Sequence, residues 1–113
     1  MTRSPSDEIT HRCDASLVRA FSFLGKRWNG LILGALSYGP AGFAELGRRL
    51  DGISDSVLSE RLVELGGAGL VDRDVAAGPP VAVTYALTGS GEAVVPALRE
   101  LASWASDNLD GVS

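Results

Sequence analysis

The stretch that decides the fold is residues 43–87, which reads FAELGRRLDGISDSVLSERLVELGGAGLVDRDVAAGPPVAVTYAL. Apolar residues recur at helical spacing from Phe43 to Leu50, and Asp51-Gly52 then signals a tight turn. Ser54 can cap the helix that follows, because its hydroxyl can accept a hydrogen bond from a free backbone N–H. The apolar residues of this second helix share one face: Leu58, Leu62 and Leu65. The pattern predicts two short helices joined by a turn.

A predicted β-hairpin follows these helices. The glycines at positions 66, 67 and 69 suit the end of a helix, because glycine adopts left-handed backbone angles at little cost. Leu70–Val75 and Val81–Leu87 are typical of strands, and the loop between them contains Gly78-Pro79-Pro80. Helix, turn, helix and ribbon is the layout of a winged helix-turn-helix. In that layout a helix fits the major groove of DNA and the ribbon lies beside it.

Three further helices make the predicted fold mainly α with one small β-hairpin. The first is capped by Asp14 or Ser16, the second covers about Lys26 to Leu36, and the last runs from the Thr88 cap to about Leu109. The apolar stripe of the last helix is longer than one end of a small domain can bury: Val94, Leu98, Leu101 and Ala105. We therefore expect a partner chain to share this stripe.

Length and composition predict one globular domain. The chain has 113 residues, of which 45% are apolar and 21% charged. We expect a polar N-terminal tail at 1–12, the domain at 13–109 and a short C-terminal tail at 110–113. No apolar run reaches the roughly 20 residues that cross a bilayer, and the first residues lack the apolar core of a signal peptide. With a single cysteine, these features predict a cytoplasmic, bacterial protein.

The charge pattern limits the kind of DNA binding that can be expected. The formal net charge is −4, although DNA-binding domains are usually basic. Between Lys26 and Arg73 six bases balance six acids, so the deficit lies in the flanks. No lysine or arginine occurs between Arg73 and Arg99, which leaves most of the hairpin without a cation. The alternative to a DNA-binding protein is therefore a winged-helix module that binds a ligand or another protein.

Seven motifs in order connect the chain to a known family: LGKRW at 24–28, FAEL at 43–46, GIS at 52–54, LSERL at 58–62, GLVDR at 69–73, PP at 79–80 and YALT at 85–88. With the closing Trp104, this series resembles the HxlR-type regulators, a bacterial group related to the MarR family. The resemblance covers about Cys13 to Leu109. It implies a homodimeric winged-helix transcription factor that binds an inverted-repeat operator in double-stranded DNA. It also implies that the fourth helix reads the DNA and that the first and last helices form the dimer.

The candidate DNA contacts lie on and around the predicted fourth helix: Ser54, Asp55, Ser56, Ser59, Arg48, Arg49, Arg61 and Arg73. Serine can donate to bases or phosphates, helix N-termini favour phosphate, and arginines bind phosphate directly. Each residue also has an ordinary structural interpretation. The serines can be caps or solvated positions, and Glu45 or Asp51 can neutralise the neighbouring arginines. Arg61 and Arg73 can instead form internal ion pairs.

Effector sites are less clearly marked in the sequence. Cys13 precedes a predicted helix start, where the helix dipole lowers thiol pKa, so it is a candidate redox sensor. The alternative is a half-buried structural cysteine, and its spacing from Trp28 departs by about two positions from the redox sensors of the family. Phe21, Trp28 and Trp104 are candidates to line a pocket for a small-molecule effector, although core packing is the simpler interpretation. His11 and Cys13 are too few for a metal site, and no catalytic group or cofactor motif is present.

Overall fold

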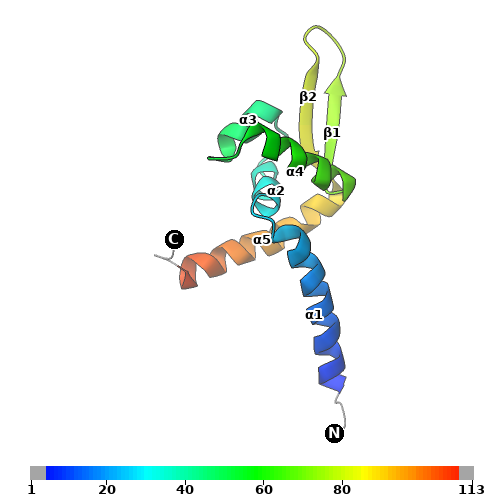
Figure 1. The fold of residues 1–113 in the computed structure, drawn as a ribbon, viewed down its shortest axis with the longest axis vertical. Coiled ribbons are helices and arrows are strands. Elements are labelled where there is room, and N and C mark those ends of the chain that lie inside the picture. The colour runs from blue at the N-terminus through cyan, green and yellow to red at the C-terminus, as the bar shows by residue number, and fades with distance from the viewer. Residues whose placement is uncertain (1–4, 110–113) are drawn as a thin grey trace.

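The computed structural model describes residues 5–109, which form five helices and one two-stranded hairpin (Figure 1). In chain order the elements are α1 (Pro5–Leu24), α2 (Asn29–Leu36), α3 (Phe43–Arg49), α4 (Asp55–Gly67), β1 (Val71–Ala76), β2 (Ala82–Leu87) and α5 (Gly89–Asn108). The prediction of a mainly helical winged helix-turn-helix is confirmed.

The core lies where α2, α3, α4 and β1 meet. Its largest buried side chains are less than a tenth exposed: Ile32, Leu33, Leu36, Leu46, Leu50, Leu58, Leu62, Leu65 and Val71. The apolar stripe of α4 therefore faces inward, as its spacing predicted. Four of the aromatic residues, Phe23, Trp28, Phe43 and Tyr85, pack against this core while remaining partly exposed.

Local hydrogen bonds fix both ends of α4. Ser54 caps its start, because the Ser54 Oγ accepts from Val57 N at 3.2 Å. At its other end Gly69 has a φ of +77°, with Gly69 N donating to Gly66 O and Leu70 N donating to Leu65 O. This pair of bonds is a Schellman motif, which turns the chain sharply into β1. The predicted cap at Thr88 is also confirmed, since Thr88 Oγ1 accepts from Gly91 N.

The hairpin is antiparallel and is attached to the body by a short bridge. Its register pairs Val71 with Leu87 at the base and Ala76 with Ala82 near the tip. Ala41 and Tyr85 exchange two backbone hydrogen bonds of 3.0 and 2.8 Å. Because Ala41 lies two residues before α3, this bridge attaches the hairpin to the start of the helix-turn-helix.

The first helix differs from its prediction. Residues 5–12 belong to α1, where we predicted a polar tail, while residues 1–4 and 110–113 lie outside the described part of the chain. Pro5 suits the first position of a helix because its φ is already helical. In Figure 1 most of this helix projects away from the body, and residues near its C-terminal end, Phe23 and Leu24, pack against the core. The chain from Gly25 to Trp28 forms turns, and α2 begins at Asn29 rather than at Lys26.

Candidate nucleic-acid interface

The first two turns of α4 present a polar face to solvent. Ser54, Asp55, Ser56 and Ser59 are all exposed, whereas the leucines of the same helix are buried. Ser54 Oγ is held by its cap bond and lies 3.4 Å from Ser56 Oγ. The exposed side chains of Asp55 and Ser59 make no hydrogen bond to the described residues. This face of α4 thus combines a fixed backbone with polar groups that remain available to a ligand.

The two arginines of α3 differ in their surroundings. Arg49 Nη2 donates to Glu45 Oε1 at 2.8 Å, and Arg49 Nη1 donates to Ala35 O at 3.0 Å. Its guanidinium therefore holds the C-terminal end of α2, and Glu45 is its neutralising partner, in agreement with the structural alternative for this arginine. Arg48 is exposed and makes no ion pair within the part of the chain that the structure describes. Of the two, Arg48 is the one free to bind phosphate.

Arg61 is partly buried and forms an ion pair within the protein. Its Nη1 donates to Glu64 Oε2 on the same helix, and its side chain is only 18% exposed. Both carboxylate oxygens of Glu64 also accept hydrogen bonds from Lys26 Nζ, at 2.8 and 3.0 Å. The Lys26 ammonium, with the charge of Arg61, holds the pKa of Glu64 below its ordinary value. This arrangement matches the internal ion pair that was the alternative to DNA contact at Arg61.

Arg73 is the single cation of the hairpin. It lies exposed on β1 opposite Tyr85, between Asp72 and Asp74, and forms no ion pair with the described residues. Successive side chains of a strand point to opposite faces, so Arg73 lies on the other face of the hairpin from its sequence neighbours Asp72 and Asp74. Any contact that the hairpin makes with a phosphate backbone depends mainly on Arg73 and on backbone N–H groups.

The three candidate ligand-lining aromatics are not gathered around one cavity. A groove of about 780 Å³ runs between α1, α2 and α5, and Phe21 lines it. Trp28 instead packs against the core and carries the Arg27 guanidinium over its ring, 4.7 Å from the centroid. Trp104 lies on α5, is 52% exposed and is not among the lining residues. The three side chains therefore have three different environments.

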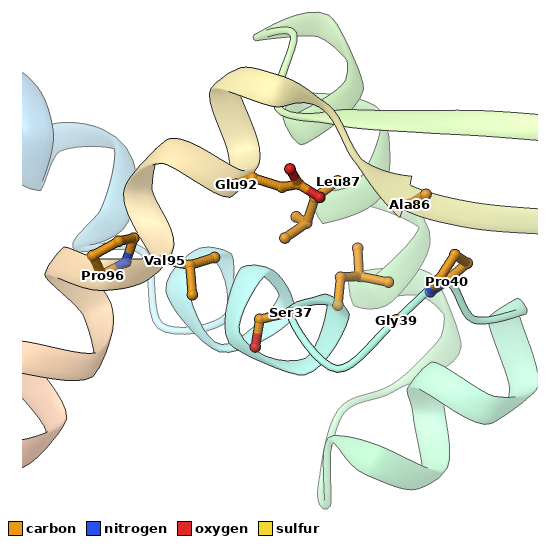
Figure 2. Close-up of a pocket in the computed structure, with 9 residues that line it drawn as sticks. Ser37, Gly39, Pro40, Ala86, Leu87, Glu92, Val95 and Pro96 are labelled. Carbon is orange, nitrogen blue, oxygen red and sulfur yellow. The ribbon is translucent and has the colours of Figure 1, made fainter.

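A smaller pocket of about 330 Å³ lies between the end of α2, β2 and the first half of α5 (Figure 2). Figure 2 shows apolar side chains around it, including Leu87, Val95 and Pro96, together with Glu92 and Ser37. The Ser37 hydroxyl already donates to Gly34 O at 2.6 Å. Glu92 is thus the one charged group in the wall, and none of the three predicted aromatics takes part.

Cys13 does not lie at a helix start. Its backbone is in the interior of α1, which begins at Pro5, and the effect of a helix dipole fades within the first turn. The prediction that a helix begins just after Cys13 is therefore wrong, and the Cys13 side chain lies outside the described residues. Within the described side chains, no three histidine, cysteine or acidic residues lie close enough together to hold a metal. No helix described in the structure has the length and apolar character to span a membrane.

Asn29 and Glu64 form a polar contact that sequence reasoning missed. Asn29 is fully buried, and its Nδ2 donates to Phe23 O at 2.9 Å and to Glu64 Oε1 at 3.4 Å. The available signal was one asparagine at the head of the otherwise apolar run NGLILGAL. Nothing in the sequence marks Glu64 as its partner, because the two are far apart along the chain.

Comparison with known proteins agrees with this geometry. A family model described as HxlR-like helix-turn-helix matches residues 23–113. The HTH-type transcriptional regulator YodB of Bacillus subtilis is 45% identical over 86 residues, which cover 76% of this chain and 77% of YodB.

Solved structures resemble the fold as a whole. The reduced form of YodB from B. subtilis superposes with a TM-score of 0.74 at 37% identity, covering 99% of this chain and all of that one. The redox regulator HypR in its reduced form gives a TM-score of 0.79 at 27% identity, covering 84% of this chain and 94% of HypR. The chain therefore belongs to the HxlR-like helix-turn-helix family, whose members are transcriptional regulators rather than enzymes.

Proposed function

We propose that this regulator acts in the cytoplasm as a homodimer that binds an inverted-repeat operator, with one α4 in the major groove of each half-site. The observation that carries the proposal is the division of α4 into a buried leucine face and an exposed polar face at Ser54–Ser59. A helix anchored in this way presents its N-terminal side chains and N–H groups to DNA without rearrangement.

The charges around α4 support a moderate electrostatic contribution to binding. Arg48 on α3 and Arg73 on β1 are exposed cations on the two elements that flank α4. Arg49 and Arg61 bind protein groups and contribute less to phosphate binding. The base contacts then come from Asp55, Ser56 and Ser59, where serine donates or accepts and a carboxylate favours the cytosine amino group.

An exposed apolar surface on α1, α2 and α5 supports the dimer. Its larger side chains are about half exposed although they are apolar: Leu17, Phe21, Leu31, Leu101 and Trp104. Several of them line the groove between these three helices. A second copy of the same surface would cover them through a twofold interface, and the partner would complete any effector pocket there.

The dimer is tested by sedimentation velocity of Leu101→Asp. Leu101 is 49% exposed on α5, so the substitution places a charge in the proposed interface without disturbing the core. We expect the variant to sediment as an 11.7 kDa monomer, while the parent sediments as a dimer. Val81→Asp is the control, because Val81 is 62% exposed on the hairpin. A dimeric Leu101→Asp, or a monomeric parent, contradicts the proposed interface.

DNA binding is tested by selecting duplexes from a random pool with the purified protein and measuring the mobility shift at two salt concentrations. We expect an inverted repeat whose affinity falls as salt rises. The acidic net charge of −4 is the observation that favours the alternative, a module that binds a ligand or a protein. Failure to enrich any duplex at low salt would support that alternative.

A response to oxidants or electrophiles through Cys13 is a second part of the proposal. Its support is the similarity to YodB and to a protein described as the redox regulator HypR. We expect diamide to change the DNA affinity of the parent and to leave Cys13→Ser unaffected. Equal responses of the two proteins to diamide would show that Cys13 is not the responding group. The absence of any response in the parent would contradict the proposed oxidant response.

A further inference from the structure

The inference concerns Asn29, the fully buried polar residue at the junction between α1 and α2. Its Nδ2 donates at 2.9 Å to the carbonyl of Phe23, in the last turn of α1. The final carbonyls of a helix have no partner within the helix, so this bond caps α1. The same Nδ2 lies 3.4 Å from Glu64 Oε1 on α4. One amide group therefore connects the end of α1 to the DNA-reading helix.

Glu64 is held from two further sides. Both of its oxygens accept from Lys26 Nζ, in the turn between α1 and α2, and Oε2 also accepts from Arg61. The carboxylate is 25% exposed and the Arg61 side chain 18%, so the group is partly screened from water. Three donors from two parts of the chain thus fix the position of this one side chain. The α1–α2 junction and α4 are joined by polar contacts as well as by the apolar core.

The two polar atoms of the Asn29 amide have different surroundings. Asn29 Oδ1 is buried without a hydrogen-bond partner among the described residues. An unpaired buried acceptor lowers the stability of the folded protein, because it has left water without gaining a new hydrogen bond. Rotating the amide would not help, because Oδ1 would then face the Phe23 carbonyl and the Glu64 carboxylate, which are both acceptors. A leucine here would fill a similar volume without that cost, so Asn29 is better explained by what its Nδ2 holds.

We propose that Asn29 and Glu64 form a positioning link that fixes the orientation of α4 relative to α1. The consequence of this link for DNA binding rests on the proposed function. When α1 helps to form the dimer, the link sets the separation and angle of the two copies of α4. Asn29 and Glu64 are then positioning residues that act on operator spacing without touching DNA.

The first test needs no DNA. Spin labels are attached in a Cys13→Ser background at Ala15→Cys on α1 and Val63→Cys on α4, both exposed positions. Excess unlabelled protein ensures that the measured pairs lie within one protomer. We expect one narrow distance distribution in the parent and a distribution about twofold broader in Asn29→Leu. An unchanged distribution in Asn29→Leu would overturn the link.

A second variant keeps the test decisive if Asn29→Leu does not fold. Glu64→Ala removes the acceptor on α4, and Glu60→Ala removes an exposed acid from the same helix. We expect broadening with Glu64→Ala and none with Glu60→Ala. Equal distributions in the two variants, whether both are narrow or both are broadened, would overturn the link.

The second test uses the duplex selected with the parent protein, with one base pair added to or removed from its centre. Each base pair shifts the half-sites by about 3.4 Å, so a rigid dimer loses affinity on both altered duplexes, by about tenfold or more. We expect Asn29→Leu to lose less than about threefold on the altered duplexes. A parent that selects no duplex contradicts the proposed function, while the label distances still decide the link.

Discussion

The salt dependence of DNA binding is predicted to change sharply when Arg48 is replaced by alanine. Arg48 and Arg73 are exposed, and neither forms an ion pair within the described residues. By contrast, Arg49 and Arg61 are bound to carboxylates. Each protomer therefore offers two free guanidinium groups near α4, and a dimer offers four. Arg48→Ala removes two of these four and leaves the polar face of α4 intact.

The magnitude follows from counterion release. Each phosphate contact contributes about 0.9 to the slope of log affinity against log salt concentration, so four contacts give a slope of about −3.6. Arg48→Ala halves this to about −1.8. Between about 50 and 200 mM salt the parent then loses about 150-fold in affinity and the variant about 12-fold. Because phosphate contacts do not read sequence, the variant weakens binding to all duplexes alike.

Fluorescence anisotropy titrations across that salt range measure the slope, with Arg49→Ala as the matched control. The Arg49 guanidinium bonds to Glu45 and to the Ala35 carbonyl, so its loss should lower the free energy of unfolding by about 1–2 kcal/mol. Its salt slope should stay near that of the parent. An unchanged slope in Arg48→Ala, or an equal decrease in both variants, would refute the assignment of free and bound arginines.

Three further predictions concern stability. In denaturant titrations, Leu58→Ala should lower the free energy of unfolding by about 3 kcal/mol, because Leu58 is 0% exposed. Val63→Ala, at a 73% exposed position of the same helix, should change the free energy of unfolding little. Gly69→Ala should lower the free energy of unfolding by about 1–2 kcal/mol, because Gly69 has a φ of +77° that alanine rarely adopts. Gly67→Ala should instead stabilise α4, and equal effects of the two substitutions would contradict the left-handed cap. The hydrogen bond from Lys26, with the charge of Arg61, holds the pKa of Glu64 in the folded protein below its ordinary value of 4.5. The ion pairs of Glu64 therefore stabilise the fold fully above pH 4.5, and this stabilisation is lost as the pH falls through the pKa of the folded state. Acid unfolding of Glu64→Gln should therefore depend less on pH, and a parent-like profile would contradict the ion pairs.

The helix-turn-helix and the hairpin could be predicted because local signals agree there with tertiary packing. The leucine spacing of α4, the Ser54 cap and the glycine stop at 66–69 all specify the same helix boundaries, within a residue or two. Each cap joins groups only a few residues apart along the chain, so both partners of the hydrogen bond can be identified from a short stretch of sequence. The hairpin follows from strand patterns on either side of the Gly78-Pro79-Pro80 loop.

The remaining features depend on contacts between distant parts of the chain. The Lys26–Glu64 ion pair and the Asn29–Glu64 contact join the α1–α2 junction to α4, and no periodicity indicates such partners. The first half of α1 was missed because it lacks an apolar stripe, the signal by which a packed helix is found. The sequence could offer only alternatives for Arg49 and Arg61, since the choice between DNA and an internal carboxylate depends on side-chain geometry.

The most direct test of the central claim is methylation interference on the selected duplex. Methyl groups on guanine N7 project into the major groove, where α4 is proposed to lie. We predict two clusters of interfering guanines, centred about one helical turn (roughly 10 base pairs) apart on one face of the duplex. Substitution at Ser56 should alter the cluster sequence that is selected. Binding that tolerates N7 methylation at every guanine of the duplex would contradict the placement of α4 in the groove.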